Sequence, residues 1–300
     1  MPQNTLIILL QLLIFPGFLF LIMLAFIYEW IDRKMVARIQ NRYGPLYTGP
    51  SGILQPVADF IKLLSKEDVI PDSADRLIFT MAPLFIFALP LTALLIIPIA
   101  NEKAIISFEG DLIFLMFILT LIAINIILSG YGSASPYSII GGVRSALQMI
   151  GYEIPAAISI IGPALSAGSL SVSGIVEWQI SRGMWAILLQ PLGFGILIVC
   201  MLAELDLIPF DIPEAETEIV AGWKTEFSGR KLALLRVGKD MEILLASALI
   251  ASLYLGGAHH IAFIPPIITF LVKSVAVLLM LSLLRAIFAR FRIDQTVSGM

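Results

Sequence analysis

The chain of 300 residues is far more apolar than a water-soluble domain. Hydrophobic residues make up 59% of it, charged residues make up 14%, and the mean hydropathy is +0.96. Soluble domains carry about 25% charged residues. The composition therefore predicts a single membrane domain over residues 1–300, in contact with the lipid bilayer. The length of such a chain sets how many membrane-spanning helices it can form rather than how many soluble domains. The net charge of −3 indicates no nucleic-acid partner.

Residues that hold redox centres are scarce. The one cysteine, Cys200, excludes an internal disulfide and a cysteine-ligated iron–sulfur or zinc site, because these need several thiolates. The two histidines, His259 and His260, are adjacent and so cannot bind one haem from two helices. We therefore predict that the chain contains no cofactor, no metal and no catalytic residue, and that electrons travel through other proteins.

Seven apolar segments are predicted to cross the membrane as helices, since one crossing takes about 20 apolar residues. They cover residues 6–31, 77–100, 111–129, 146–167, 184–203, 241–257 and 261–284. The first is too long for a signal-peptide core and has no small-residue cleavage site before Arg33, so we interpret it as a retained helix. The predicted fold class is an all-α, polytopic helical bundle.

The loops between these segments differ strongly in positive charge. Sixteen Lys and Arg residues fall in loops 32–76, 130–145 and 204–240 and in the C-terminal tail, whereas the opposite loops hold two, Lys103 and Arg182. Positive residues collect on the cytoplasmic side of a membrane. This distribution predicts a multi-pass protein of the cell membrane, with its N-terminus outside and its large loops in the cytoplasm.

Loop 32–76 contains a predicted amphipathic helix with Ser51 as its N-cap. Its apolar positions share one face and are Ile53, Leu54, Val57, Ile61 and Leu64. Its polar positions fall elsewhere and include Gln55, Asp59, Lys62 and Lys66. We expect this helix to lie flat at the membrane interface. A plain membrane anchor with no further role is an equal alternative.

Loop 204–240 is strongly acidic between Glu204 and Glu226, where seven carboxylates face one cation, Lys224. The seven are Glu204, Asp206, Asp211, Glu214, Glu216, Glu218 and Glu226. Asp211 and Glu214 match a capping box, which predicts a short helix with Glu214 and Glu218 on one face. Like charges that are shielded from water have raised pKa values and can pass protons near neutral pH. The alternative is a solvated acidic loop.

Two charged residues lie inside predicted membrane segments, Glu153 in the fourth and Lys273 in the seventh. A charge at such depth costs about 2.5 to 3.5 kcal/mol on insertion scales, so it usually faces the bundle interior and marks an ion path. Pro155 also loosens the helix backbone beside Glu153. The alternative is a structural ion pair inside the bundle.

Short polar stretches over nearly the whole chain form a recognisable set. They are Asp32-Arg33-Lys34 with Gln40, Arg42 and Gly44-Pro45; Gly49-Pro50, Leu54-Gln55-Pro56, Ala58-Asp59 and Lys62; Arg144, Gln148 and Tyr152-Glu153; Ala203-Glu204, Pro209-Phe210-Asp211 and Pro213-Glu214-Ala215-Glu216 with Glu218; Glu226-Phe227-Ser228-Gly229; and Lys273 with Arg290-Phe291-Arg292 and Asp294-Gln295. In these residues the chain resembles the NADH-dehydrogenase subunit 1 family of respiratory complex I, known as NuoH in bacteria, and its relatives in membrane-bound nickel–iron hydrogenases.

The resemblance implies a subunit that joins a peripheral redox arm to antiporter-like membrane subunits. It implies a chamber beneath the last iron–sulfur cluster of that arm, bordered by the helix around Asp59 and by the acidic loop, and a carboxylate path into the membrane. The family usually has a further helix after Asp294-Gln295, which gives seven to eight transmembrane helices.

The residues implied for a proton or charge relay are Glu153, Glu204, Asp211, Glu214, Glu216, Glu218, Arg144 and Lys273. The residues implied for the chamber and the interface with the peripheral arm are Arg33, Lys34, Arg38, Arg42, Asp59, Lys62, Glu226 and Asp240.

Two departures from the family pattern indicate the branch. Quinone-reducing members tend to carry Asn-Arg where this chain has Asp206-Leu207, and Glu-Tyr where it has Lys239-Asp240. The acidic loop and the stretch 228–234 look more like archaeal hydrogenase-type complexes. We therefore expect the membrane anchor and coupling subunit of a ferredoxin-linked, ion-translocating hydrogenase-type complex. Iron–sulfur clusters and a nickel–iron centre are expected in its hydrogenase-like partner subunits.

Three alternatives stay open. The chain could be the quinone-site subunit of an NADH or related dehydrogenase. It could be an autonomous ion transporter in which Glu153 and Lys273 line the path, although the two halves of the chain show no evident repeat. It could also be a passive scaffold, in which case neutralising the acidic loop alters assembly or nothing.

Overall fold

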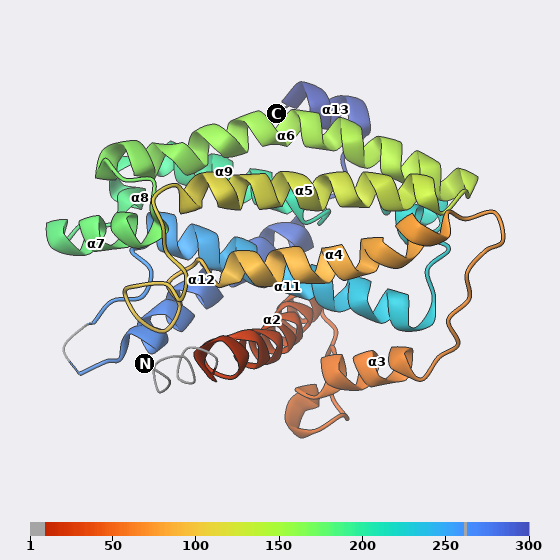
Figure 1. Ribbon diagram of the computed structural model, residues 1–300, viewed down its shortest axis with the longest axis horizontal. Helices are drawn as coiled ribbons and strands as arrows, with labels where there is room; N and C mark the ends of the chain where they lie inside the picture. The colour runs from red at the N-terminus through yellow and green to blue at the C-terminus, as the bar shows by residue number, and fades with distance from the viewer. Residues whose placement is uncertain (1–9, 261–262, 300) are drawn as a thin grey trace.

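The computed structural model describes residues 10–260 and 263–299, without the side chains of residues 297 and 298. Within these ranges the regular secondary structure consists of helices alone (Figure 1), which confirms the predicted fold class. The helices are α2 (Phe18–Ile39), η1 (Pro50–Gly52), α3 (Gln55–Leu64), α4 (Arg76–Leu94), α5 (Asp111–Gly132), α6 (Pro136–Ala167), α7 (Val172–Arg182), α8 (Ala186–Leu189), α9 (Pro191–Glu204), α10 (Glu216–Ile219), η2 (Gly222–Lys224), α11 (Gly229–Tyr254), α12 (Pro266–Ile287) and α13 (Ile293–Gly299).

Five helices of the described ranges are long and apolar enough to cross a membrane. They are Leu10–Ile39, which includes α2, and Arg76–Leu94, Asp111–Gly132, Pro136–Ala167 and Pro266–Ile287. Each overlaps one of the predicted segments, although the first helix extends past residue 31 and α6 begins before residue 146. The predicted start of the first segment at Leu6 lies outside the described residues, as do residues 261 and 262 of the seventh.

The other two predicted segments are helical but differ from the prediction. Segment 184–203 is not one helix, because the backbone leaves the helical region at Gln190 and Pro191 cannot continue the hydrogen bonds of α8. The resulting α9 has 14 residues and is about 21 Å long, shorter than a hydrocarbon core of about 30 Å. Segment 241–257 overlaps the second half of α11, which begins earlier, at Gly229, and ends at Tyr254.

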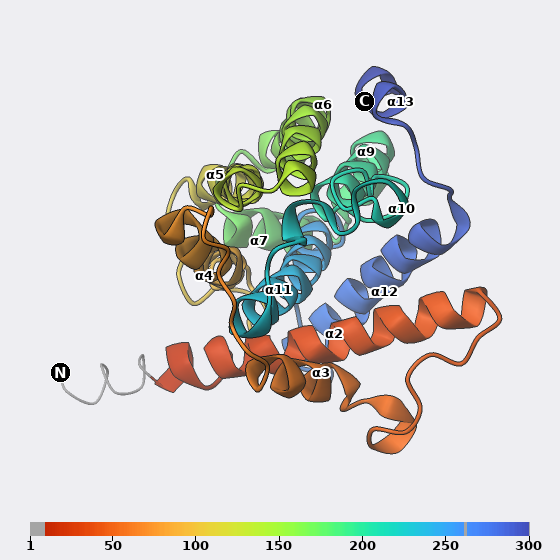
Figure 2. The ribbon, with the colours of Figure 1, turned by 90° about the vertical axis from the view of Figure 1, so that its right-hand side faces the viewer.

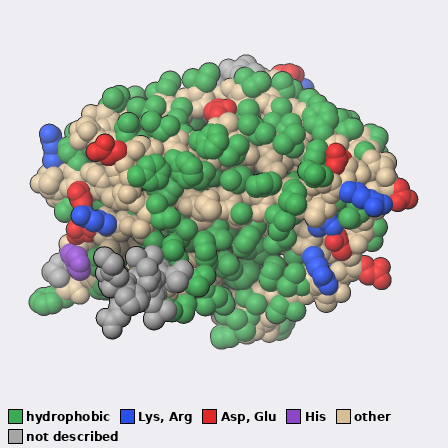
Figure 3. Space-filling view, in the orientation of Figure 1, with side chains coloured by type: hydrophobic (Ala, Val, Ile, Leu, Met, Phe, Trp, Pro, Cys, Tyr) green, Lys and Arg blue, Asp and Glu red, His purple; other side chains and the backbone are tan. Residues whose placement is uncertain are grey.

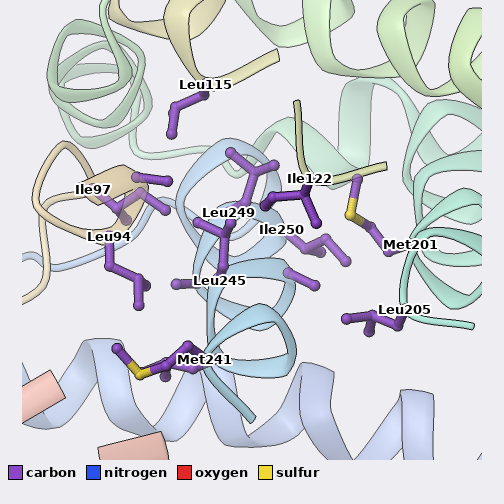
Figure 4. Close-up of a cluster of buried hydrophobic side chains, with 14 of the residues drawn as sticks. Leu94, Ile97, Leu115, Ile122, Met201, Leu205, Met241, Leu245, Leu249 and Ile250 are labelled. Carbon is purple, nitrogen blue, oxygen red and sulfur yellow. The ribbon is translucent and has the colours of Figure 1, made fainter. Parts of the chain in front are cut away.

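Helix α11 forms the centre of the bundle (Figure 2). Every residue from Leu244 to Tyr254 is buried, and α11 packs against α4, α2 and α12. Figure 4 shows Leu245, Leu249 and Ile250 of this helix among side chains of α4, α5 and α9. The charged residues Lys231, Asp240 and Glu242 of the same helix are also buried, whereas Arg230 and Arg236 are exposed.

A glycine sets the close approach of α4 to the charged part of α11. A Cβ atom added at Gly238 would lie 2.6 Å from Ile86 Cγ2 and 2.7 Å from Ile86 O. No side chain fits at this distance, so glycine allows the contact. Lys239 follows directly and is held at this packed position.

The outer surface is apolar across the middle of the bundle. Figure 3 shows a broad area of hydrophobic side chains, with most of the charged side chains towards its two ends. Along α6 the exposed residues Ile150, Ile154, Ile158 and Leu165 contribute to this surface. Such an area suits lipid or other membrane helices as a neighbour rather than water.

The amphipathic helix is present, but it begins later than predicted. Ser51 makes no capping hydrogen bond, has a φ of 56° and belongs to η1. The helix α3 begins at Gln55, with Pro56 in its first turn. Pro56 and Leu63 are buried, whereas Ile61 and Leu64 stay exposed. The apolar face is therefore only partly covered, and a flat position at the interface remains a prediction.

Candidate functional site

A charged cavity of about 480 Å³ lies at the end of the bundle where α2, α11 and α12 meet the loop after α9. Its charged lining comprises seven carboxylates and six cations. They are Glu29, Asp32, Asp206, Asp211, Glu214, Glu216 and Asp240, with Arg33, Lys224, Arg236, Lys239, Arg285 and Arg290. We call this space the acidic-loop cavity.

Beside the cavity, Arg33 of its lining joins α2 to α3, although no residue of α3 lines the cavity itself. Arg33 forms an ion pair with Glu29 and donates a hydrogen bond of 2.9 Å to Asp59. Gln55 Nε2 donates a second hydrogen bond of 2.9 Å to Asp59 Oδ1. Partial burial acts to raise the pKa of Asp59, but these hydrogen bonds and the charge of Arg33 outweigh it and lower that pKa. Asp59 is therefore an ionised residue that fixes α3 against α2.

A buried ion cluster forms the centre of the cavity wall. Lys239 Nζ lies 3.2 Å from Asp206 Oδ2 and 2.8 Å from Glu242 Oε2, and all three side chains are nearly inaccessible to water. Burial raises the pKa of Asp206 to about 7, although Lys239 opposes the change and Glu214 reinforces it. Asp206 can thus take up or release a proton near neutral pH.

Three carboxylates of the acidic loop are paired with cations, two of which come from distant parts of the chain. Asp211 pairs with Arg290, Glu214 with Lys224, and Arg144 lies 2.6 Å from Glu218. Burial raises the pKa of Asp211, and Arg290 opposes that rise. Glu216 lines the cavity as an exposed residue.

The predicted capping box is wrong. Residues 211–215 are not helical, and the helix that follows, α10, begins at Glu216 and has four residues. Asp211 and Glu214 turn towards their cations instead of capping a helix. Tertiary contacts rather than a local capping box therefore decide the conformation of this segment.

A path leads from the cavity into the membrane region. Gln148 Nε2 donates to Ala203 O at 2.8 Å and lies 3.4 Å from Asp206 Oδ1. Glu204 is buried, interacts electrostatically with Asp206 and lies within hydrogen-bonding reach of the Tyr152 hydroxyl. Glu204 Oε1 has no hydrogen-bond partner in the described part of the protein. Because buried polar atoms nearly always have a hydrogen-bond partner, we expect this oxygen to carry a proton or to bind a water molecule.

The path ends at Glu153. Glu204, Tyr152, Glu153 and Thr120 line one small pocket between α5, α6 and α9, with a volume of about 40 Å³. That volume is enough for a water molecule, which needs about 10 to 15 Å³ by this measure. Thr120 Oγ1 donates to Glu153 Oε1 at 2.5 Å. Glu153 is half-buried and is thus placed between the carboxylate path and the outer surface of α5 and α6.

Lys273 lies apart from this path. Its Nζ is 2.9 Å from Gly257 O and 2.9 Å from His259 Nδ1, and it lies over the Trp185 ring. Along α12 it is about 18 Å from Arg285, which lines the cavity. Among the described residues no ion pair joins Lys273 to Glu153, so the geometry does not support the alternative of a structural pair.

The remaining predicted residues fall into two groups. Arg33 and Asp240 line the cavity, and Asp240 lies within hydrogen-bonding reach of Glu29. Lys34, Arg38, Arg42, Lys62 and Glu226 do not line it. Arg38, Arg42 and Lys62 are exposed at the same end. In the ranges that the structure covers, no group of three or more His, Cys, Asp or Glu residues is arranged to hold a metal ion.

Sequence reasoning missed several residues of the site. Lys239 and Glu242 are three positions apart on α11, so helix periodicity alone could have predicted their ion pair. Arg285 pairs with Asp32 at 2.6 Å, and Arg290 pairs with Asp211. These two contacts join residues some 250 and 80 positions apart, and no local pattern indicates them.

Fold and site together define a helical membrane protein with a charged cavity at one end and a buried carboxylate path. A comparison with models of known protein families matches residues 10–300 to the family described as NADH dehydrogenase. The chain therefore belongs to this family, that of subunit 1 of respiratory complex I. It is a membrane subunit of a complex I-type oxidoreductase complex, and other subunits of such a complex are its partners.

Proposed function

We propose that the chain is the membrane anchor and coupling subunit of an ion-translocating, ferredoxin-linked hydrogenase-type complex. It docks a peripheral redox arm and relays protons or charge to antiporter-like membrane subunits. The observation that carries the proposal is the arrangement of Asp206, Glu204, Tyr152 and Glu153, which connects the acidic-loop cavity to a half-buried carboxylate inside the membrane region.

The peripheral arm docks at the cavity end. Loops 32–76 and 204–240 are on the cytoplasmic side in this proposal, with the N-terminus outside. Exposed Arg38, Arg42 and Lys62 give this end a polar docking surface, and the cavity opens beside them. The hydrogenase-like and iron–sulfur subunits hold the iron–sulfur clusters and the nickel–iron centre, and they carry out the redox chemistry.

Coupling uses the proton affinity of buried carboxylates. A negative charge that arrives on a redox centre near the cavity favours protonation of Asp206, whose pKa of about 7 lies in the useful range. A change of charge at Asp206 is felt by Glu204, which interacts with it electrostatically. The Tyr152 hydroxyl and the small pocket then connect Glu204 to Glu153. Glu153 passes the proton or the charge to an antiporter-like neighbour.

The Asp206–Lys239 pair favours the hydrogenase-type branch. Asp206 and Lys239 stand at two positions that differ from the pattern of quinone-reducing members, and they contact each other at 3.2 Å. The pair puts a buried charge cluster into the cavity wall. A largely apolar quinone ring is a poor ligand for such a wall. Its binding would displace water from the charged side chains without replacing the hydrogen bonds that the water makes.

Replacing Glu153 tests the coupling role. In the purified complex, reconstituted into vesicles, Glu153→Gln is expected to keep hydrogen evolution while ion transport per hydrogen falls at least about tenfold. Glu177→Gln is a matched control, because Glu177 is a half-exposed carboxylate near Lys103 outside the path. Unchanged ion transport in an assembled Glu153→Gln complex contradicts the relay.

The composition of the complex tests the branch. We expect the chain to co-purify with a nickel-containing subunit and to evolve hydrogen from reduced ferredoxin. A complex that lacks nickel and reduces a quinone assigns the chain to the quinone-linked branch of its family instead. A chain that transports ions without any partner subunit would identify it as an autonomous transporter.

A further inference from the structure

A lysine and a histidine form a pair at the end of the bundle away from the acidic-loop cavity. Lys273 is near the start of α12, and His259 is in the segment 255–260, which follows α11. Lys273 Nζ lies 2.9 Å from His259 Nδ1 and 2.9 Å from Gly257 O. Figure 1 shows α7 and α8, which pack against α11, at the end of the bundle away from α3. We call residues 255–260 the post-α11 segment.

The post-α11 segment is held against α12 by two side chains, Lys273 and Thr269. Residues 256–258 are buried. The His259 amide donates to Thr269 Oγ1 at 3.3 Å, and the same oxygen lies 2.9 Å from His259 O. Lys273 adds its contacts with Gly257 O and with the imidazole ring. Because the backbone of His259 is fixed in this way, its ring stays within reach of Lys273.

Lys273 is a buried cation without a carboxylate partner. It is 9% exposed, and within residues 10–260 and 263–299 no Asp or Glu forms an ion pair with it. Its Nζ lies 5.5 Å from the centroid of the Trp185 ring, and such a position favours the charged ammonium form. An ammonium group has donors only, so His259 Nδ1 accepts this hydrogen bond and the imidazole is neutral.

The contact between the two nitrogens holds while one of the two groups is neutral. If His259 takes up a proton beside the charged lysine, two donors face each other and two positive charges repel. Partial burial and the charge of Lys273 lower the pKa of His259, although the Gly257 carbonyl and Glu102 act in the opposite direction. Protonation of the ring and the contact with Lys273 therefore oppose each other.

The charged residues of the neighbouring helix α7 are engaged elsewhere. Glu177 lies 4.0 Å from Lys103, and the guanidinium group of Arg182 lies over the Trp178 ring. Glu102, in the loop between α4 and α5, is thus the carboxylate that acts on His259, and it only weakens the effect of Lys273.

We infer that Lys273 and His259 form a proton-sensitive lock on the post-α11 segment. With His259 neutral, Lys273 ties the segment to α12. When His259 takes up a proton, the contact breaks and the segment is released. In the topology of the proposed function this end of the bundle lies outside, so the lock responds to external pH, but the lock itself does not depend on that topology.

The direction of the pH dependence follows from the pKa of His259. The locked form binds a proton more weakly than a free histidine, whose pKa is about 6.5. Release is therefore linked to proton uptake. The lock is fully present above about pH 6.5 and is lost progressively as the pH falls.

The test measures amide hydrogen exchange of the post-α11 segment in the purified complex. Exchange is compared at about pH 7.5 and about pH 5, on either side of the ordinary histidine pKa, after correction for the intrinsic effect of pH on exchange. We expect protection to fall at least about tenfold at the lower pH, the effect of losing one charged hydrogen bond. Protection that is equal at both pH values overturns the inference.

Three variants assign the effect to the pair. His259→Asn keeps an acceptor near the position of Nδ1 but cannot titrate, so it is expected to lose the pH dependence and to stay protected in acid. Lys273→Met removes the cation and is expected to leave the segment weakly protected at both pH values. His260→Gln changes the adjacent, exposed histidine and is expected to behave as the wild type.

The same variants can contradict the lock. A fall in protection in His259→Asn as large as in the wild type overturns it, because another group would then be titrating. So does wild-type protection of Lys273→Met at the higher pH, or loss of the pH dependence in His260→Gln.

Discussion

The carboxylate of Asp206 lies 3.2 Å from the ammonium group of Lys239, and both side chains are nearly inaccessible to water. Lys239 also lies 2.8 Å from Glu242, so one cation serves two buried carboxylates. Asp206 follows α9, and Lys239 belongs to α11. The contact therefore joins the acidic loop to the central helix, and neither residue can lose its charge without affecting the other.

Removing the cation is expected to destabilise the protein. Lys239→Met leaves Asp206 and Glu242 buried without their counter-charge, and breaking a buried pair costs about 3 to 5 kcal/mol. The double variant Asp206→Asn with Lys239→Met is expected to recover part of that loss, because one uncompensated charge is gone. Apparent unfolding temperatures of the purified complex measure both effects. Additive losses in the double variant would show that the two residues are not coupled.

The raised pKa of Asp206 predicts how stability depends on pH. The pKa is about 7 in the folded protein and about 3.9 in an unfolded chain. Between these values the folded state holds one more proton than the unfolded state. Its contribution to stability is thus fully present below about pH 4 and is lost as pH rises to about 7, by about 1.4 kcal/mol per pH unit.

Asp206→Asn is expected to flatten this dependence. Apparent unfolding temperatures at pH 5, 6 and 7 measure the slope for the wild type and the variant. Asp72→Asn, at an exposed position outside the cavity, serves as the control and is expected to keep the wild-type slope. An Asp206→Asn variant with the same slope as the wild type would contradict a titration of Asp206 in this range.

The hydrogen bond from Thr120 is expected to be needed for the role of Glu153. Thr120→Val keeps the shape of the side chain but removes the donor at 2.5 Å from Glu153 Oε1. A hydrogen bond to a charged group contributes about 1.5 to 3 kcal/mol, so a loss of ion transport of about tenfold or more is expected in vesicles. Thr120→Ser keeps the hydroxyl and should stay close to the wild type. Equal transport by the Val and Ser variants would rule out this role.

The segment after α12 is expected to hold the acidic loop in place. Arg290 pairs with Asp211, the Phe291 amide donates to Pro209 O at 2.9 Å, and the Phe291 ring packs edge-on against Phe210. Arg290→Gln removes a charged hydrogen bond worth about 1.5 to 3 kcal/mol. Amide hydrogen exchange of residues 211–219 is expected to become at least about tenfold faster.

Arg292→Gln is the control for this prediction. Its side chain is exposed, and its backbone amide donates a hydrogen bond to Gln295 Oε1 at 3.1 Å. Exchange in the acidic loop is expected to stay at the wild-type rate. If Arg290→Gln and Arg292→Gln behave alike, the pairing of Arg290 with Asp211 does not hold the loop.

Much of the fold could be predicted from hydrophobicity, but the interior of the site could not. Long apolar runs identify the helices because lipid demands that each crossing satisfies its own backbone hydrogen bonds. The break at Gln190 and the long, charged start of α11 escaped prediction. Gln190 lies in a continuous apolar run, and the charges of α11 are tolerated only because neighbouring helices bury and pair them.

The sequence alone determined that Glu153 lies within a membrane segment and that carboxylates gather between Glu204 and Glu226. Only the tertiary structure decided their partners. It set Arg290 against Asp211 and Lys239 against Asp206, brought Glu204 and Glu153 to one pocket, and left Lys273 with His259. The reason is physical. The hydrophobicity of neighbouring residues in the sequence predicts which segments lie in the membrane. Ion pairs instead depend on distances between residues that only the packed helices bring together.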